Sequence, residues 1–224
     1  MLSSSVPRLA ALVVVGLVAT TGSAVTAVPF DPTVQPLSDK VRLPRWEAAL
    51  QEIADDRGVL QRCLAKAADC PLDATRAWRS MMLDAGGTSA EAKLESVNRF
   101  VNGLPYARDE DRKGVLDHWS GPLEFLAEGG DCEDYAIAKY VSLRELGMAP
   151  RDLRIVVLED RARGLAHAIL AVRLGREVWV LDNHSDAIEP FTRLPHYDPY
   201  YAVNEDGRWL HRIPGQPTPA APTH

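Results

Sequence analysis

The amino-acid sequence predicts an α+β fold in which a helical N-terminal half packs on an antiparallel sheet. Apolar residues recur at helical spacing through much of the chain up to residue 146, and short runs rich in Val, Ile and Leu follow residue 152. A last helix beginning near Cys132 connects the two halves. We expect residues 28–214 to form one domain, because a chain of this length can bury one substantial core.

Three amphipathic helices are expected in the N-terminal half. Each is marked by apolar side chains at helical spacing: Trp46, Leu50, Ile53, Leu60 and Leu64 in the first, Trp78, Met81 and Met82 in the second, and Leu94, Val97 and Val101 in the third. Gly86 and Gly87 end the second helix, and Thr88 and Ser89 cap the third. Such faces are typical of a protein core rather than of a cofactor site. The charged run 108–113 is expected to be a solvated loop.

The segment GGDCEDYAIA, residues 129–138, places Cys132 between two carboxylates at the start of an apolar helix. Asp131 is the expected N-cap, which puts Cys132 in the first turn. The helix dipole and the free N–H groups of that turn favour a thiolate. The sequence therefore indicates a reactive thiol, and an inert cysteine at a helix start is the alternative.

A base and an orienting carboxylate follow on three expected strands, residues 153–159, 166–174 and 177–181. His167 opens the second strand and Asp182 ends the third. Adjacent antiparallel strands can bring these side chains together, and a cysteine nucleophile needs both groups. Taken singly, the histidine could be a surface residue and the aspartate a turn residue. His118 and His184 are interpreted as surface residues.

Residues 119–186 resemble the bacterial transglutaminase-like cysteine peptidases, specifically the LapG family of periplasmic proteases. The matching pieces include GGDCEDYAIA, AHAILAV and VWVLDN. The resemblance implies a papain-like, transglutaminase-like fold with a Cys132, His167 and Asp182 triad. It also implies cleavage of the N-terminal region of a large cell-surface adhesin, which promotes biofilm dispersal, and inhibition by an inner-membrane cyclic di-GMP receptor. Trp119 matches a family tryptophan and either walls the cleft or belongs to the core.

Calcium is the cofactor that the resemblance implies, bound by Asp131 and Glu133. Asp134 and the backbone near Asn183 are possible further ligands. Ca²⁺ takes about six to eight oxygen ligands, and clustered carboxylates that repel one another favour a hard cation. The alternative is that these acids cap the helix and complement its dipole. Two other functions stay open, a transglutaminase-like acyltransferase and a non-enzymatic calcium-dependent binding protein.

The N-terminus has the pattern of a signal peptide. Residues 1–27 contain Arg8, an apolar run over 9–19 and small residues before a cleavage site after Ala27. We therefore expect export to the periplasm, with an uncleaved N-terminal anchor as the alternative and no embedding in the membrane. Removing Arg8 makes the formal net charge one unit more negative than −6. An acidic chain without Lys/Arg clusters is not typical of a nucleic-acid-binding protein.

Cys63 and Cys70 are expected to form a disulfide, as the oxidising periplasm permits. On one continuous helix they would lie about 10.5 Å apart, too far for the bond. The helix must therefore end between them, as Pro71 and the residues before Cys70 allow, or the two cysteines are unpaired. Residues 215–224, with three prolines, are expected to be a disordered tail.

Overall fold

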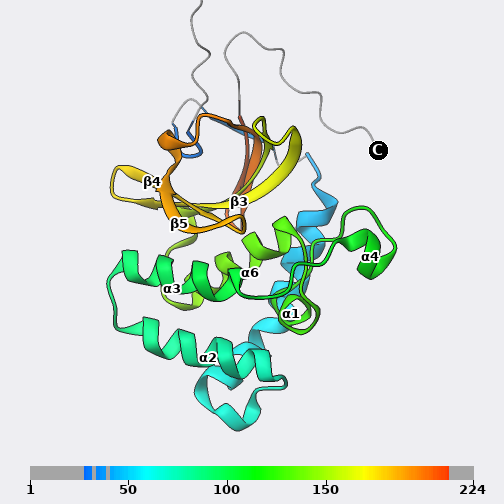
Figure 1. The fold of residues 1–224 in the computed structure, drawn as a ribbon, viewed down its shortest axis with the longest axis vertical. Coiled ribbons are helices and arrows are strands. Elements are labelled where there is room, and N and C mark those ends of the chain that lie inside the picture. Colours follow the sequence, from blue (N-terminus) through cyan, green and yellow to red (C-terminus); the bar gives the residue numbers. More distant parts are fainter. Residues whose placement is uncertain (1–27, 32–33, 39–40, 212–224) are drawn as a thin grey trace, which may run out of the picture.

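The computed structural model describes residues 28–31, 34–38 and 41–211, and it confirms the α+β prediction. The helices pack beneath one face of a curved antiparallel sheet (Figure 1). The expected signal peptide, residues 1–27, and the expected tail, residues 215–224, lie outside the described residues. Within the described part of the chain, no helix combines the length and the apolar character needed to span a bilayer.

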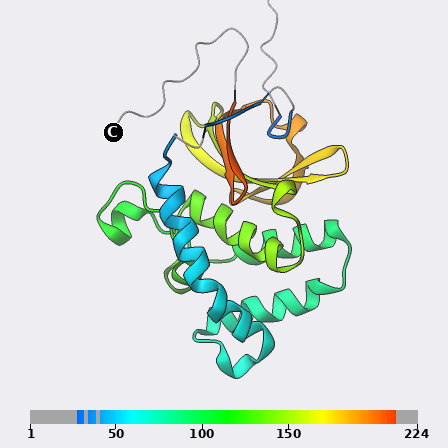
Figure 2. The same ribbon diagram turned by 180° about the vertical axis from the view of Figure 1, so that it is seen from behind.

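Within the described residues, six α-helices form the helical layer. Their bounds are Pro44–Ala65 (α1), Asp73–Gly86 (α2), Ala90–Asn102 (α3), Asp109–Lys113 (α4), Pro122–Glu128 (α5) and Cys132–Glu145 (α6). Pro44 starts α1, where the missing N–H costs nothing, and Ser89 caps α3 by accepting a hydrogen bond from the Ala92 N–H at 3.3 Å. Seen from behind, α1 runs from the level of the sheet to the level of α2 (Figure 2).

The sheet has seven described strands in the order β1-β7-β6-β2-β3-β4-β5. The bounds are Gln35–Pro36 (β1), Leu153–Asp160 (β2), Leu165–Leu174 (β3), Glu177–Asp182 (β4), Ser185–Pro190 (β5), Tyr197–Asn204 (β6) and Gly207–Leu210 (β7). The three predicted strands are β2, β3 and β4, each correct to within one residue at either end. Pairing within the sheet is antiparallel throughout.

Helix α6 lies at the centre of the core and is buried from Glu133 to Leu143. It packs against α3 and α5 on the helical side and against β3 on the sheet side. This position explains why its apolar residues cover all of its faces. Trp119 also belongs to this core: it is 6% exposed and its ring packs edge-on against Trp46 at 6.2 Å. The core interpretation of Trp119 is therefore the correct one.

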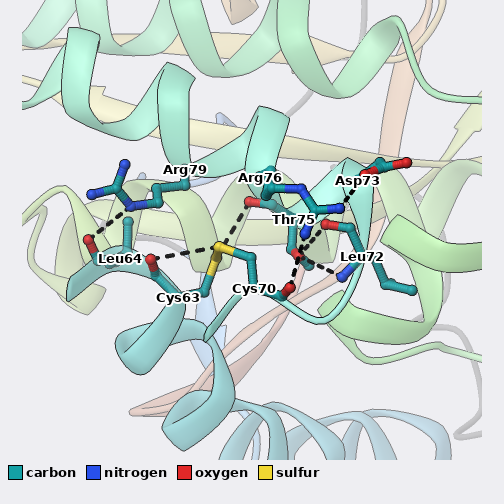
Figure 3. The surroundings of a disulfide bond; sticks show 8 residues. All are labelled: Cys63, Leu64, Cys70, Leu72, Asp73, Thr75, Arg76 and Arg79. Carbon is teal, nitrogen blue, oxygen red and sulfur yellow. Dashed lines mark hydrogen bonds and ion pairs between the residues drawn. A yellow bond between two sulfur atoms is a disulfide. The ribbon is translucent and has the colours of Figure 1, made fainter. Parts of the chain in front are cut away.

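The predicted disulfide between Cys63 and Cys70 is present (Figure 3). Helix α1 ends at Ala65 and a short 3₁₀ turn follows, which brings the two Cα atoms to 4.4 Å. The Arg76 guanidinium donates a hydrogen bond to the Cys70 carbonyl at 3.2 Å. Cys132 is consequently the one free thiol of this three-cysteine chain.

We expect non-reducing peptide mass analysis of exported protein to find Cys63 linked to Cys70 and Cys132 free. Because the closed loop is short, replacing both cysteines by alanine should lower the free energy of unfolding by about 2–3 kcal/mol. Thermal unfolding of the double variant measures this loss. Three alkylated thiols in protein trapped under native conditions would contradict the prediction.

Candidate active site

The loop before α6 is held tightly against residues 105–107. Gly129 has φ +76°, and a Cβ there would lie 2.2 Å from the Pro105 carbonyl oxygen. A Cβ on Gly130 would collide with the Asp134 side chain. The Ala107 N–H donates to the Gly130 carbonyl at 2.9 Å, so the two segments run side by side. Glycine is thus required at both positions, because a side chain there would collide with Pro105 or with Asp134. The two glycines directly precede the first turn of α6.

Asp131 is the N-cap of α6, as predicted, and Cys132 occupies the first turn. The Asp134 carboxylate closes the cap by accepting the Asp131 N–H at 3.1 Å. Helix α6 packs on β3. The Ala168 N–H lowers the pKa of the Cys132 thiol, so the sulfur lies beside the residue that follows His167.

His167 and Asp182 are in direct contact. The His167 Nε2 lies 3.0 Å from Asp182 Oδ1, and the two residues are 2% and 6% exposed. Asp182 also accepts hydrogen bonds from the Tyr197 hydroxyl and from the His184 N–H. Burial acts to raise the Asp182 pKa, but the hydrogen bond and charge of His167, together with the Tyr197 hydroxyl, hold it well below its usual value.

His184 is an exposed residue, as expected, but it also contacts the candidate base. Its ring stacks on His167, with 4.4 Å between ring centroids, and its side chain is 31% exposed. Burial lowers the pKa of His184, and the neighbouring His167 lowers it further. The tight β4–β5 turn brings this ring back over His167, which the sequence position of His184 does not reveal.

The surroundings of Cys132 oppose ionisation of its thiol. Burial raises the Cys132 pKa far above its ordinary value, and Glu133, whose carboxylate lies 3.1 Å from the sulfur, raises it further. The Ala168 N–H lowers it, but less strongly. That the helix start favours a thiolate stays a prediction, because burial and the flanking carboxylates oppose ionisation of the thiol as long as no cation compensates them. The thiolate needs a compensating positive charge.

Asp131 and Glu133 form an acidic pair around this thiol. Burial and the hydrogen-bonded Asp131 raise the Glu133 pKa to about 10, and burial also raises the Asp131 pKa. Asp131 Oδ1 is buried and has no hydrogen-bond partner among the described residues. The Asp131 and Glu133 carboxylates and the Cys132 sulfur offer atoms within 4.8 Å of one another. A buried carboxylate oxygen without a partner, next to a second carboxylate, fits a Ca²⁺ ligand set.

Asp134 is engaged differently, by an arginine that the sequence did not single out. Its carboxylate accepts the Ser120 N–H at 2.7 Å and lies 3.3 Å from the Arg112 guanidinium. Arg112 also binds Asp109 and the Gly129 carbonyl. The Arg112 guanidinium thus already supplies a positive charge to the cluster of Asp109, Asp131 and Asp134. Asp131 and Glu133 are then the carboxylates that are left to coordinate an ion. The role of Asp134 as a ligand stays a prediction, as does that of Asn183 in the β4–β5 turn.

Residues 108–113 are therefore not the solvated loop that we expected. Asp109–Lys113 form α4, in which Asp109 is buried and the Arg112 side chain is only 9% exposed, while the other residues of the run are exposed as expected. Alternating charges usually indicate a solvated face, and no local signal in this run shows that its partners lie in the α5–α6 region.

The site lies within a segment that matches a known family. Residues 52–211 match the family model described as bacterial transglutaminase-like cysteine proteinase BTLCP. The chain belongs to this family. The match spans Cys132, His167 and Asp182, and it confirms the resemblance found in the sequence.

Solved structures of LapG from Legionella pneumophila resemble this proteinase over most of their length. One is 30% identical, covers 67% of this chain and 87% of its own, and has a TM-score of 0.59. A calcium-bound structure is 29% identical, with the same coverage and a TM-score of 0.60. An EGTA-treated structure is 29% identical, covers 70% and 88%, and has a TM-score of 0.61. A comparison with curated proteins found no match.

Proposed function

We propose that this proteinase is a calcium-dependent endopeptidase that uses Cys132, His167 and Asp182 as its catalytic triad. The observation that carries the proposal is the buried contact between His167 Nε2 on β3 and Asp182 Oδ1 on β4, at 3.0 Å, with α6 packed on β3. A histidine oriented by a buried carboxylate beside a cysteine is the arrangement that thiol acyl transfer needs.

The chemistry follows from the orientation of the imidazole. Asp182 accepts a hydrogen bond from the Nε2–H group of His167. This leaves Nδ1 of His167 as the base that takes the Cys132 proton. The thiolate attacks the substrate carbonyl, and backbone N–H groups of the first turn of α6 stabilise the oxyanion. His167 then gives its proton to the leaving amine. Water, activated by the same imidazole, hydrolyses the acyl-enzyme.

Asp131 and Glu133 are the residues that would hold calcium, and bound calcium supplies positive charge beside the thiol. Asp134 holds the loop by capping α6 and binding Arg112. Calcium-bound and EGTA-treated structures of the Legionella protein support the assignment of this cofactor.

For the biological role, we propose an exported, periplasmic enzyme. Its substrate would be the N-terminal region of a large cell-surface adhesin, and its release of that adhesin would disperse biofilm. An inner-membrane receptor that binds cyclic di-GMP would inhibit it. The family membership and the likeness to LapG support this proposal, and the N-terminal leader pattern supports export.

The test is incubation of the purified protein with calcium and an N-terminal fragment of a large repeat adhesin from the same genome. We expect a new peptide N-terminus, identified by mass spectrometry, whether or not a primary amine is added. Incorporation of the amine into an uncut fragment would show an acyltransferase instead. Binding of the fragment with neither product would show a non-enzymatic binding protein.

A further inference from the structure

A second histidine covers the ring of the proposed base. The imidazoles of His167 and His184 lie nearly parallel, with an interplanar angle of 13° and 4.4 Å between ring centroids. His184 is an exposed residue of the turn between β4 and β5, whereas His167 on β3 is 2% exposed. Stacked aromatic rings at about this separation attract each other. One face of the His167 ring is therefore closed by His184.

The turn that carries His184 is tied to the triad aspartate. Asp182 Oδ1 accepts the His184 N–H at 2.9 Å and lies 3.0 Å from His167 Nε2. An aspartate that binds the backbone two residues later forms an Asx turn, which fixes the local direction of the chain. The Asn102 side chain on α3 donates to the Asp182 and Ser185 carbonyls at 2.9 and 3.0 Å and braces the same turn. One carboxylate oxygen thus holds both the base and the residue that stacks on it.

The hydrogen bond to Asp182 fixes the His167 ring only in part. Rotation of a histidine ring about its Cβ–Cγ bond has shallow preferences. Nε2 lies near the axis of that rotation and Nδ1 lies farther from it, so a contact at Nε2 holds Nδ1 weakly. The Tyr197 ring approaches His167 at a tilt of 56°, with 6.0 Å between centroids, and does not stack on it. The ring of His184, which lies flat against His167, is the contact that resists this rotation.

We propose that His184 is a positioning residue whose ring, stacked on His167, keeps Nδ1 of that base directed at Cys132. Its side chain acts through His167 and does not touch the reacting atoms. The inference rests on the proposed function, because it assigns His184 to the support of the same triad. Stacking needs an aromatic ring and no particular charge, so phenylalanine is the conservative replacement at this position.

The test follows the Nε2–H proton of His167 by NMR in calcium-containing buffer, which needs no substrate. An imidazole N–H that is buried and bound to a carboxylate exchanges slowly with water and gives a far-downfield signal, which His167→Gln assigns by its loss. We expect this signal in the wild type. His184→Ala should lose it, because removing the ring exposes His167 to water and lets it turn, and His184→Phe should restore it.

Kinetics with the adhesin fragment give a second readout. Because the stack orients the base without binding substrate, His184→Ala should lower kcat about 10-fold and leave KM within about twofold of the wild-type value. His184→Phe should recover most of the loss. His184→Ala should fold, since the backbone N–H bond to Asp182 remains, and circular dichroism verifies this.

His196→Ala is the matched control. The His196 ring packs edge-on against Tyr197, also with 4.4 Å between centroids, and so lies beside the site without stacking on His167. This variant should keep the His167 signal and the wild-type kcat. An equal loss in this control, an unchanged signal and kcat in His184→Ala, a His184→Phe variant no better than His184→Ala, or a raised KM with unchanged kcat would each overturn the positioning role.

A failure of the proposed function would look different. A wild type that shows the His167 signal but does not cleave the fragment would refute the proposed function, and the signal in the His184 variants would still decide the positioning role. A wild type without the signal would refute the contact between His167 and Asp182, and both proposals with it.

Discussion

Replacing Cys132 with alanine is expected to abolish cleavage of the adhesin fragment. Triad members act as a unit, so loss of the nucleophile should lower turnover by at least about 10⁴-fold. The fold should persist, because Cys132 lies at the partly exposed start of α6 and its Sγ forms no disulfide. Fragment cleavage followed over time measures the loss, and circular dichroism verifies the fold.

Two further proteins sharpen this experiment. Asp182→Asn should lower turnover strongly by releasing the His167 ring, and combining it with Cys132→Ala should add almost nothing. The protein in which both Cys63 and Cys70 are alanine is the matched control, since it loses two distant cysteines and should keep its activity when folded. Wild-type turnover by Cys132→Ala would end the cysteine-protease interpretation.

Removal of calcium should lower activity about 100-fold or more. Without a cation, the Asp131 and Glu133 carboxylates oppose ionisation of the neighbouring thiol, and the pKa of Cys132 is raised accordingly. Activity after EGTA treatment should return with Ca²⁺ and much less with Mg²⁺, which is smaller and requires stricter geometry. Calcium should also raise the unfolding temperature, a readout that does not depend on catalysis.

Asp131→Ala and Glu133→Ala should each reproduce the effect of chelation, without rescue at ordinary calcium concentrations. Glu110→Ala is a matched control, since it removes an exposed carboxylate of the nearby α4. Full activity of the wild-type protein after EGTA treatment, with metal analysis confirming removal, would reduce these acids to helix caps. Stabilisation by calcium that persists in both alanine variants would place the ion elsewhere.

The sequence could predict the features that depend on neighbouring residues. The N-cap at Asp131, the three strands and the break between Cys63 and Cys70 all rest on local patterns, and all are present. The strand pattern proposed His167 and Asp182 as partners and the resemblance supported this, and their contact depends on the pairing of β3 with β4.

What escaped prediction depends on residues distant in sequence. Arg112 is buried because Asp134 and the Gly129 carbonyl, on another segment, bind it. A helix dipole can be read from the sequence, whereas the burial that opposes ionisation of Cys132 cannot.

The two outer strands of the sheet bear on how the protein behaves at high concentration. One outer strand, β1, has only two residues, and Pro36 has no N–H to offer a neighbouring chain. The other, β5, carries Asp186 and Glu189 and ends at Pro190. Short length, prolines and charges all hinder strand-to-strand joining of separate molecules. Neither edge of the described sheet is therefore a good template for pairing with a strand of another molecule.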